Sequence, residues 1–234
     1  MSEDDLRTLA RYCESVFDLG TALPETDFGY QSLPLCVIDA VYSIGVRYAS
    51  TVNVVERYCE CFGLQKVRTE PGLPPPDQQE SVTYFLRKLE RMGIERFAGE
   101  VFANWQRTST RNGILKAEAV LRFAEVLCAR SVDYFQDVPK VVSDDGFAEE
   151  IKSIPGQRSG VSLSYFFMLT GSDDLVKPDR WVLRFLRDAL GREVAQSDAL
   201  VLIQGACALL LARYPHLSPR SLDHAIWEYQ SGLR

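Results

Sequence analysis

Apolar residues recur at helical spacing along almost the whole chain, and this period limits the folds open to it. In the segment 4–19 the apolar residues that share one helical face are Leu6, Leu9, Ala10, Cys13, Val16 and Phe17. No run keeps the alternation of apolar and polar residues that is typical of a strand. The sequence therefore predicts an all-α fold. The helices are expected at 4–19, 34–43, 51–62, 78–92, 94–105, 114–130, 144–151, 179–190, 197–213 and 218–230, with a further apolar helix after residue 160.

A tight hairpin is expected at 154–160, where the sequence is IPGQRSG. Pro155 fixes its own φ angle, and Gly156 and Gly160 permit backbone angles that other residues resist. Turn amides and helix N-termini bind phosphate oxygens without a large basic patch. The hairpin and the helix after it are thus a candidate anion-binding turn, although the hairpin can also be a plain helix connector.

Asp179 is the residue most suited to chemistry. It follows Pro178 and precedes an apolar-periodic run, so it is predicted to be a helix N-cap. A fixed carboxylate can also stabilise a developing positive charge, and can orient or deprotonate a water molecule. Both interpretations of Asp179, cap and catalytic group, stay open on spacing alone.

Two segments at similar spacing carry a family resemblance: Ile154-Pro155-Gly156, which begins the hairpin, and Val176-Lys177-Pro178-Asp179. They resemble the core of the helix-hairpin-helix DNA glycosylases (the HhH-GPD superfamily). That family has an LPGVG-type hairpin, an apolar helix and then a V-P-x-D segment with a catalytic Asp. The resemblance extends more weakly to residues 37–58, which are similar to the first barrel helix and the turn after it, and to 111–127, which are similar to an N-x-x-K-A segment.

The resemblance implies a two-lobed helical fold within one compact unit. A central bundle with the hairpin is expected at 31–164, and a second lobe is expected to combine 1–30 with 165–234. DNA is expected to lie in the groove between the lobes, with Asp179 at its edge.

The resemblance also implies an activity, base excision from DNA by hydrolysis of the N-glycosidic bond with Asp179. Gly160 occupies the position of the Schiff-base Lys of bifunctional members, so a monofunctional enzyme without lyase activity is implied. Arg158 replaces the second Gly of the hairpin, and Gly45 or Val46 replaces an upstream Gln. Only Cys207 follows the last core helix, so no iron–sulfur cluster is expected. No cofactor is implied, with a monovalent cation on the hairpin carbonyls as the one candidate ligand.

The site residues that the resemblance implies fall into two groups. The residues expected to bind DNA are Pro155, Gly156, Gln157, Arg158, Ser159 and Gly160, which would use backbone amides, together with Arg47 and Lys116. The residues expected to line a pocket for a flipped base are Tyr42, Ser43 and Tyr48. The alternatives are that Lys116 is a solvated charge and that the tyrosines belong to the core, which is more expected of Tyr42 than of Tyr48.

The net charge of −6 is not that of a typical nucleic-acid binder, but the acids are unevenly distributed. Residues 1–29 carry a net charge of −5 and residues 137–150 carry −4, which leaves +3 for the rest. A local basic face can exist on an acidic protein, because the local field governs docking.

The six cysteines are scattered without the spacing of a zinc or iron–sulfur site, so no metal is expected. Reduced thiols and an acidic N-terminus without a signal-peptide core favour a cytoplasmic protein. The longest apolar run, 199–212, is interrupted by Gln204 and is too short to cross a bilayer, so no membrane association is expected.

Two functions from different classes are consistent with the sequence. The first is the glycosylase, with double-stranded DNA as its partner. The second is a non-catalytic protein of the same fold that binds DNA or a protein partner, which the altered hairpin and the acidic balance favour.

Overall fold

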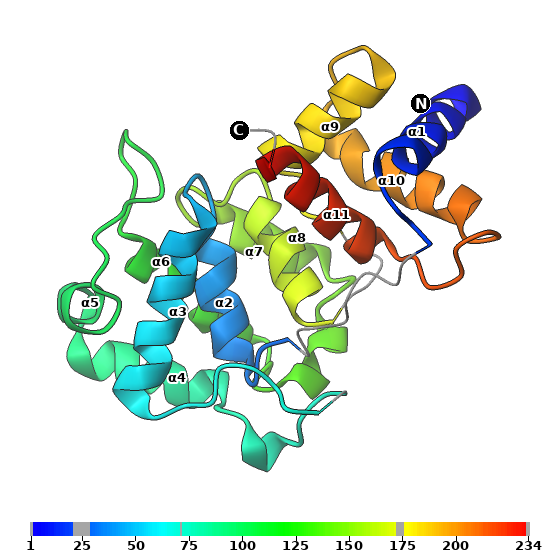
Figure 1. The fold of residues 1–234 in the computed structure, drawn as a ribbon. Coiled ribbons are helices and arrows are strands. Elements are labelled where there is room, and N and C mark those ends of the chain that lie inside the picture. Colours follow the sequence, from blue (N-terminus) through cyan, green and yellow to red (C-terminus); the bar gives the residue numbers. More distant parts are fainter. Residues whose placement is uncertain (1, 21–28, 71, 172–175, 233–234) are drawn as a thin grey trace. The chain divides into compact units, whose positions relative to one another are not determined.

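The computed structural model describes residues 2–20, 29–70, 72–171 and 176–232, and these residues are helical apart from turns, loops and two isolated bridges (Figure 1). The all-α prediction is therefore confirmed for this part of the chain. The chain divides into two compact units, unit 1 with Met1–Thr26 and Gly171–Arg234, and unit 2 with Asp27–Thr170. The sequence placed the corresponding changes after residues 30 and 164. No helix in the described ranges combines the length and apolarity needed to span a membrane.

Unit 1 is built from the two ends of the chain. Its described helices are α1 (Glu3–Val16), α9 (Arg180–Leu190), α10 (Gln196–Leu210) and α11 (Pro219–Gly232). The first helix begins with a capping box in which Ser2 and Asp5 each accept the other's backbone N–H. The last begins with Pro219 at its first position, where the fixed φ of proline is favourable, and Ser218 Oγ accepts the Ser221 N–H at 3.1 Å.

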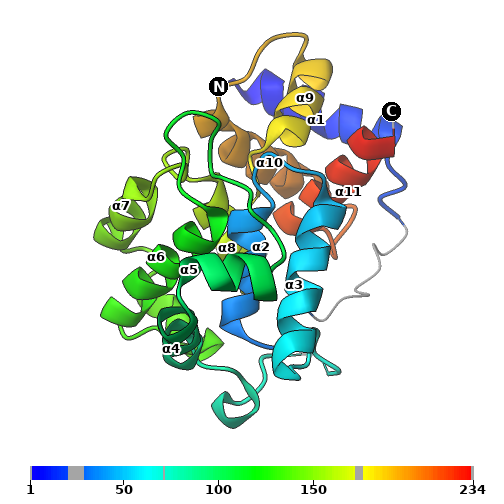
Figure 2. The same ribbon diagram turned by 90° about the vertical axis from the view of Figure 1, so that its left-hand side faces the viewer.

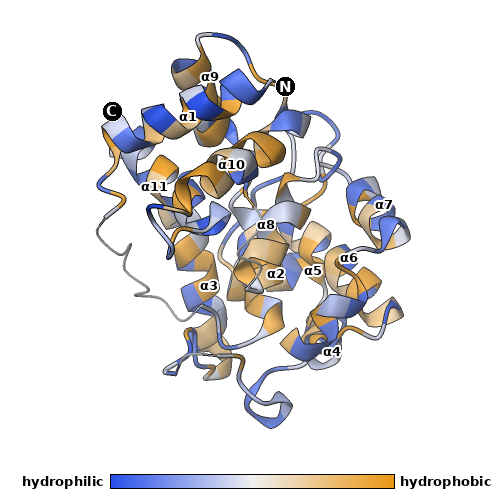
Figure 3. Cartoon of the chain, turned by 90° about the vertical axis from the view of Figure 1, so that its right-hand side faces the viewer, coloured by the Kyte–Doolittle hydropathy of each residue, from blue (hydrophilic) through white to orange (hydrophobic). Residues whose placement is uncertain are grey.

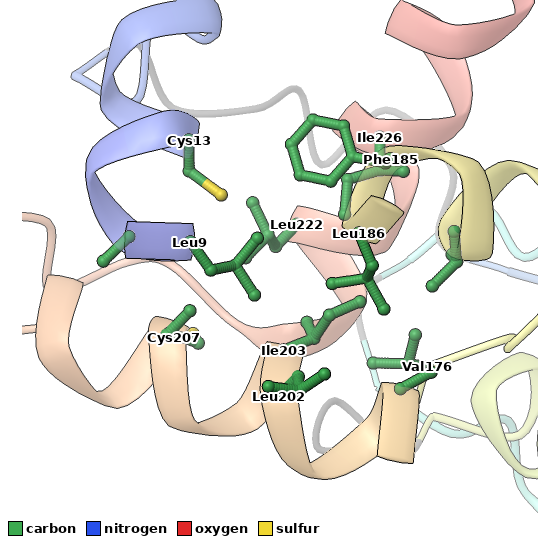
Figure 4. Packing of buried hydrophobic residues seen from close by; sticks show 14 of the residues in the cluster. Leu9, Cys13, Val176, Phe185, Leu186, Leu202, Ile203, Cys207, Leu222 and Ile226 are labelled. Carbon is green, nitrogen blue, oxygen red and sulfur yellow. The ribbon is translucent and has the colours of Figure 1, made fainter. Parts of the chain in front are cut away.

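The core of unit 1 is made of the apolar faces of these four helices (Figure 4). Leu9 and Cys13 of α1 face Phe185 and Leu186 of α9, and α10 and α11 close the same cluster. Most of α10 is apolar, as its colour in Figure 3 shows. Val176, only 1% exposed, extends this cluster to the segment just before Asp179.

Unit 2 is organised around one buried helix. Its described helices are α2 (Leu33–Tyr42), α3 (Tyr48–Phe62), η1 (Pro76–Gln78), α4 (Val82–Met92), α5 (Ile94–Arg96), η2 (Phe97–Val101), α6 (Lys116–Ala129), η3 (Phe135–Lys140), α7 (Asp145–Ser153) and α8 (Val161–Leu169). All residues of α2 are buried, and α3, α6 and α8 pack against it (Figures 1 and 2). A helix that is apolar on every side has to be central to its bundle.

One buried ion pair lies in this bundle. The Lys88 ammonium contacts the Glu80 carboxylate, and the Tyr58 hydroxyl donates to both carboxylate oxygens at 2.8 Å. Only 12% of the Lys88 side chain and 2% of the Glu80 side chain are exposed. The ammonium also lies 4.0 Å from the centroid of the Phe62 ring, so both charges are compensated where they are buried.

Several local expectations were wrong. The helix expected at 94–105 changes to a π-helix at Phe97–Val101 and ends there, and Trp105, which lies beyond it, is 59% exposed. The helix expected at 197–213 begins one residue earlier, at Gln196 after its N-cap Ala195, and ends at Leu210. Such ends are decided by packing rather than by local propensity, which makes them the least predictable part of a helix.

Candidate functional site

Asp179 lies in an extended conformation at the N-terminus of α9. Its Oδ1 accepts hydrogen bonds from the backbone N–H groups of Trp181 at 2.8 Å and Val182 at 3.3 Å, which confirms the predicted cap. Both bonds go to the same oxygen. Oδ2 receives no hydrogen bond from the described residues, so this atom is available to a ligand or to water.

Two hydrogen bonds fix the backbone before Asp179. The Asp179 N–H donates to the carbonyl of Lys177 at 2.7 Å, which closes a tight turn around Pro178. The Lys177 N–H in turn donates to Oδ1 of Asp223 on α11 at 3.1 Å. Asp223 is therefore connected to Asp179 through a single turn of backbone.

Asp223 is an acidic residue in a buried position, with only 8% of it exposed. Burial raises the pKa of Asp223, and the negative charge of Asp179 raises it further, to about 8. The Lys177 charge and its N–H oppose this rise. The two acids thus form a pair in which Asp223 holds its proton near neutral pH, a pattern that is enriched at functional sites.

Asp223 is not among the site residues predicted from the sequence, although one signal for it exists. Leu222, Asp223 and Ile226 share the buried stripe of α11. An acid inside such a stripe needs a specific partner. The partner, the Lys177 N–H, lies 46 residues away in sequence, so the spacing alone could not identify it.

The hairpin at 154–160 consists of two consecutive turns between α7 and α8. The Gln157 N–H donates to Ile154 O and the Gly160 N–H donates to Gln157 O, each at 2.9 Å. Pro155 and Gly156 (φ 88°) occupy the central positions of the first turn, as in a type II turn. Gly160 (φ 76°) is the N-cap of α8.

A loop from an earlier part of unit 2 supports this hairpin. A Cβ added to Gly156 would lie 2.3 Å from Cβ of Thr108, so only glycine fits there. A Cβ added to Gly160 would instead meet Cε of Lys152 at 3.3 Å. The Lys152 side chain therefore passes beside Gly160.

The outer side of the hairpin has the features of an anion site. The N–H groups of Gly156, Arg158 and Ser159 make no hydrogen bond to described residues, and the N-terminus of α8 follows directly. The side chains of Lys152 and Arg158, both exposed, line a surface depression that also includes Glu149. Two cations and several N–H groups thus meet at one turn.

Three of the expected amide contacts are excluded by this geometry. Pro155 has no N–H group, and the N–H groups of Gln157 and Gly160 are used inside the turns. The Gln157 side chain is also buried, with 2% exposure. The set of hairpin amides that could bind a phosphate is therefore corrected to Gly156, Arg158 and Ser159.

Lys116 does not have the solvent-facing position expected of a phosphate contact. It is 3% exposed, and its Nζ donates to the carbonyls of Tyr42 and Ile44, each at 2.8 Å. The ammonium thus caps the C-terminal end of α2, where a positive charge is favoured by the helix dipole. The expectation for Lys116 is corrected to a structural role.

Of the three residues expected to line a base pocket, Tyr42 is fully buried beside Phe102, with ring centroids 5.1 Å apart. The prediction for Tyr42 is corrected, since its ring cannot meet a base. Tyr48 is 41% exposed at the start of α3, beside the exposed N-cap Arg47, and Ser43 is the half-buried C-cap of α2. The roles of Tyr48, Arg47 and Ser43 stay predictions.

In the described ranges no group of three or more His, Cys, Asp or Glu side chains could hold a metal ion. The cation considered for the hairpin would use carbonyl oxygens instead.

Comparison with known proteins gave one match. A family model described as a domain of unknown function (DUF8548) matches residues 7–231. Searches of curated proteins and of solved structures found no match.

Proposed function

The chain belongs to the DUF8548 family, whose description assigns no function, and we propose that this member is a monofunctional DNA glycosylase. It would flip a modified base out of duplex DNA and hydrolyse the N-glycosidic bond with Asp179. The observation that carries the proposal is the state of the Asp179 carboxylate. Oδ1 is fixed on the N-terminus of α9, and Oδ2 receives no hydrogen bond from the described residues.

Cleavage of an N-glycosidic bond places positive charge on the sugar as the base leaves. A carboxylate oxygen held near the sugar stabilises this charge, and can orient the attacking water or accept its proton. Paired carboxylates stabilise a similar positive charge on the sugar in glycoside hydrolysis. Asp179 has the restraint that this role requires, because a helix N-terminus and a backbone turn hold it.

Double-stranded DNA is the proposed partner. The amides of Gly156, Arg158 and Ser159, with the cations of Lys152 and Arg158, would bind a backbone phosphate. Arg47 and Tyr48 would act at the flipped nucleotide, with Ser43 as a polar group of its pocket.

A second candidate function is a non-catalytic protein of this fold that binds DNA or a protein. One observation favours it: the two hydrogen bonds to Asp179 Oδ1 explain this residue as a helix cap without any chemistry. Arg158 in the hairpin would then serve binding only.

The deciding experiment is Asp179→Asn in a gel assay for abasic sites on duplexes with alkylated, deaminated or oxidised bases. Asn keeps the cap but supplies no carboxylate, so excision should fall by a factor on the order of 100 or more while DNA binding persists. Asp144→Asn is the matched control, because Asp144 is also an N-cap, of α7, and should leave excision unchanged. If Asp179→Asn leaves excision unchanged, Asp179 is only a cap.

The product distinguishes hydrolysis from lyase chemistry. Because Gly160 has no side chain, the abasic strand should stay intact until it is treated with alkali or heat. Borohydride trapping of an enzyme–DNA adduct would contradict this. Lys152, which passes beside Gly160, and Lys177 would then be the residues to replace.

DNA affinity tests the hairpin separately from the chemistry. Arg158→Ala should weaken binding to all duplex sequences similarly and reduce the salt dependence of binding by about one phosphate contact. Arg192→Ala is the control, since Arg192 is engaged by Asp5 in unit 1. Absence of salt-dependent binding at low ionic strength would leave a protein partner as the better proposal.

A further inference from the structure

Asp223 is more than a buried acid of the α11 core. Position 223 lies between Leu222 and the buried Ile226, where an apolar side chain would pack without any cost of desolvation. An acid is present instead, and the charge that raises its pKa most is that of a second acid, Asp179. Stability alone does not account for an Asp at position 223, because the negative charges of two neighbouring acids repel each other.

Two consecutive hydrogen bonds, both through the backbone of Lys177, connect Asp223 to Asp179. Oδ1 of Asp223 accepts the Lys177 N–H at 3.1 Å, and Lys177 O accepts the Asp179 N–H at 2.7 Å. Pro178 lies between these two bonds with its φ angle fixed by its ring. The position of the Asp179 backbone is therefore set from α11, while the direction of its carboxylate is set by the N-terminus of α9.

We propose that Asp223 is a positioning residue for Asp179, holding through the Lys177 N–H the turn that sets where the Asp179 carboxylate lies. The inference rests on the proposed function, because it assigns Asp223 to the same reaction. Asp223 itself does not touch the substrate. Its effect on the reaction passes through Lys177 and the turn at Pro178.

The charged groups that act on the pKa of Asp223 are Asp179 and Lys177, both from the segment before α9. The helix α9, which packs on α11, carries Arg184, Arg187 and Asp188. The helix α10, which also packs on α11, has one charged residue, Asp198, exposed near its N-terminus. On α11 itself, Arg220 is half-buried, and His224 is exposed and pairs with Glu228 at 3.4 Å.

Two substitutions separate positioning from other roles. Asp223→Asn keeps an oxygen that accepts the Lys177 N–H, so excision should fall by less than about tenfold. Asp223→Leu fills the space but removes the acceptor, so the turn loses its anchor. The excision rate should then fall by roughly 10- to 100-fold, with DNA affinity unchanged. His224→Gln, one residue along the same helix, should leave the rate unchanged.

A titration tests the pair without any substrate. In the wild type, carboxyl NMR signals should show Asp223 titrating near pH 8. In Asp179→Asn the same signal should titrate at lower pH, because the neighbouring negative charge is gone. The backbone amide signal of Lys177 should follow the Asp223 titration, since Asp223 accepts its N–H. These measurements also apply if Asp223→Leu does not fold.

The outcomes distinguish this inference from the proposed function. If no tested base is excised but Asp223 titrates near pH 8, and at lower pH in Asp179→Asn, the glycosylase proposal fails and the linkage of the two acids stands. If excision is found but Asp223 titrates near pH 4, or if Asp223→Asn is as damaging as Asp223→Leu, then the positioning role is overturned and the glycosylase remains.

Discussion

In unit 2 the buried carboxylate of Glu80 meets the ammonium of Lys88 and the hydroxyl of Tyr58. In unit 1 the buried carboxyl group of Asp223 meets the Lys177 N–H and the negative charge of a second acid, Asp179, which acts on it more strongly than the opposing charge of Lys177. A buried acid with a basic partner is explained by the fold itself. A buried acid beside another acid is not, and such a site is where a function should be sought.

The same contrast holds for the aspartates that cap helices. Asp144 caps α7 in unit 2 and contacts the guanidinium of Arg130, and Phe147 donates its N–H to the same carboxylate. These contacts lower the pKa of Asp144, with the Phe147 N–H as the main cause. Asp179 caps α9 in unit 1 and faces Asp223 instead. Two residues with the same local role thus have different charged neighbours.

The largest effect expected of a single substitution would break the ion pair of unit 2. Lys88→Met should lower the free energy of unfolding by about 3–5 kcal/mol, because the Glu80 carboxylate would stay buried without its cation. Urea denaturation followed by circular dichroism measures this. Lys66→Met is the control, since the Lys66–Glu56 pair is largely solvated and should contribute less than about 1 kcal/mol. Equal losses in the two variants would contradict the contrast between buried and exposed pairs.

The next effect is the pH dependence that Asp223 should give to stability. Its pKa is about 8 in the folded protein against an ordinary value of 3.8, so the folded state binds more protons between these values. The contribution to the free energy of unfolding is therefore greatest below pH 4. This contribution falls by up to about 1.4 kcal/mol per pH unit as the pH rises toward 8. Above pH 8 it no longer changes with pH.

Urea denaturation between pH 5 and pH 8.5 checks this, with Asp223→Asn as the reference. The wild type should lose stability relative to the variant as the pH rises. If the two curves run parallel, Asp223 does not titrate in this range, and the difference between the units disappears.

The smallest effect compares the two capping aspartates near pH 7.5. Asp144→Asn keeps the cap but loses attraction to Arg130, so the unfolding free energy should fall slightly. Asp179→Asn also keeps the cap but removes repulsion from the pair with Asp223, so its stability should be unchanged or slightly raised. Thermal melts of both variants would show this, and equal losses would mean that Asp179 is not paired with a second acid.

Much of the fold could be predicted from the sequence because its signals are local. The cap at Asp179, the proline at the first position of α11 and the two glycines of the hairpin each act within a few residues. The helical period of each segment identified most of the helices, and the wrong boundaries occur where packing changes the end of a helix, as at Phe97–Val101.

The candidate site was less predictable, because burial decided it. Lys116 and Tyr42 look like surface and pocket residues in the sequence. The fold places the Lys116 ammonium on the end of α2 and the Tyr42 ring in the core. The hairpin amides were reduced in number for a simpler reason, since two of them close the turns that form it.

The sequence by itself determined the all-α class, the hairpin and the position of Asp179 at a helix start, because helical period and capping depend on neighbouring residues. Only the tertiary structure decided that Asp223 lies at the same site. A residue on the last helix reaches the Lys177 N–H when α11 packs beside α9, and the burial and the nearby negative charge that raise its pKa arise from that packing. The chemistry of a carboxyl group depends on what surrounds it in space, and those neighbours come from distant parts of the chain.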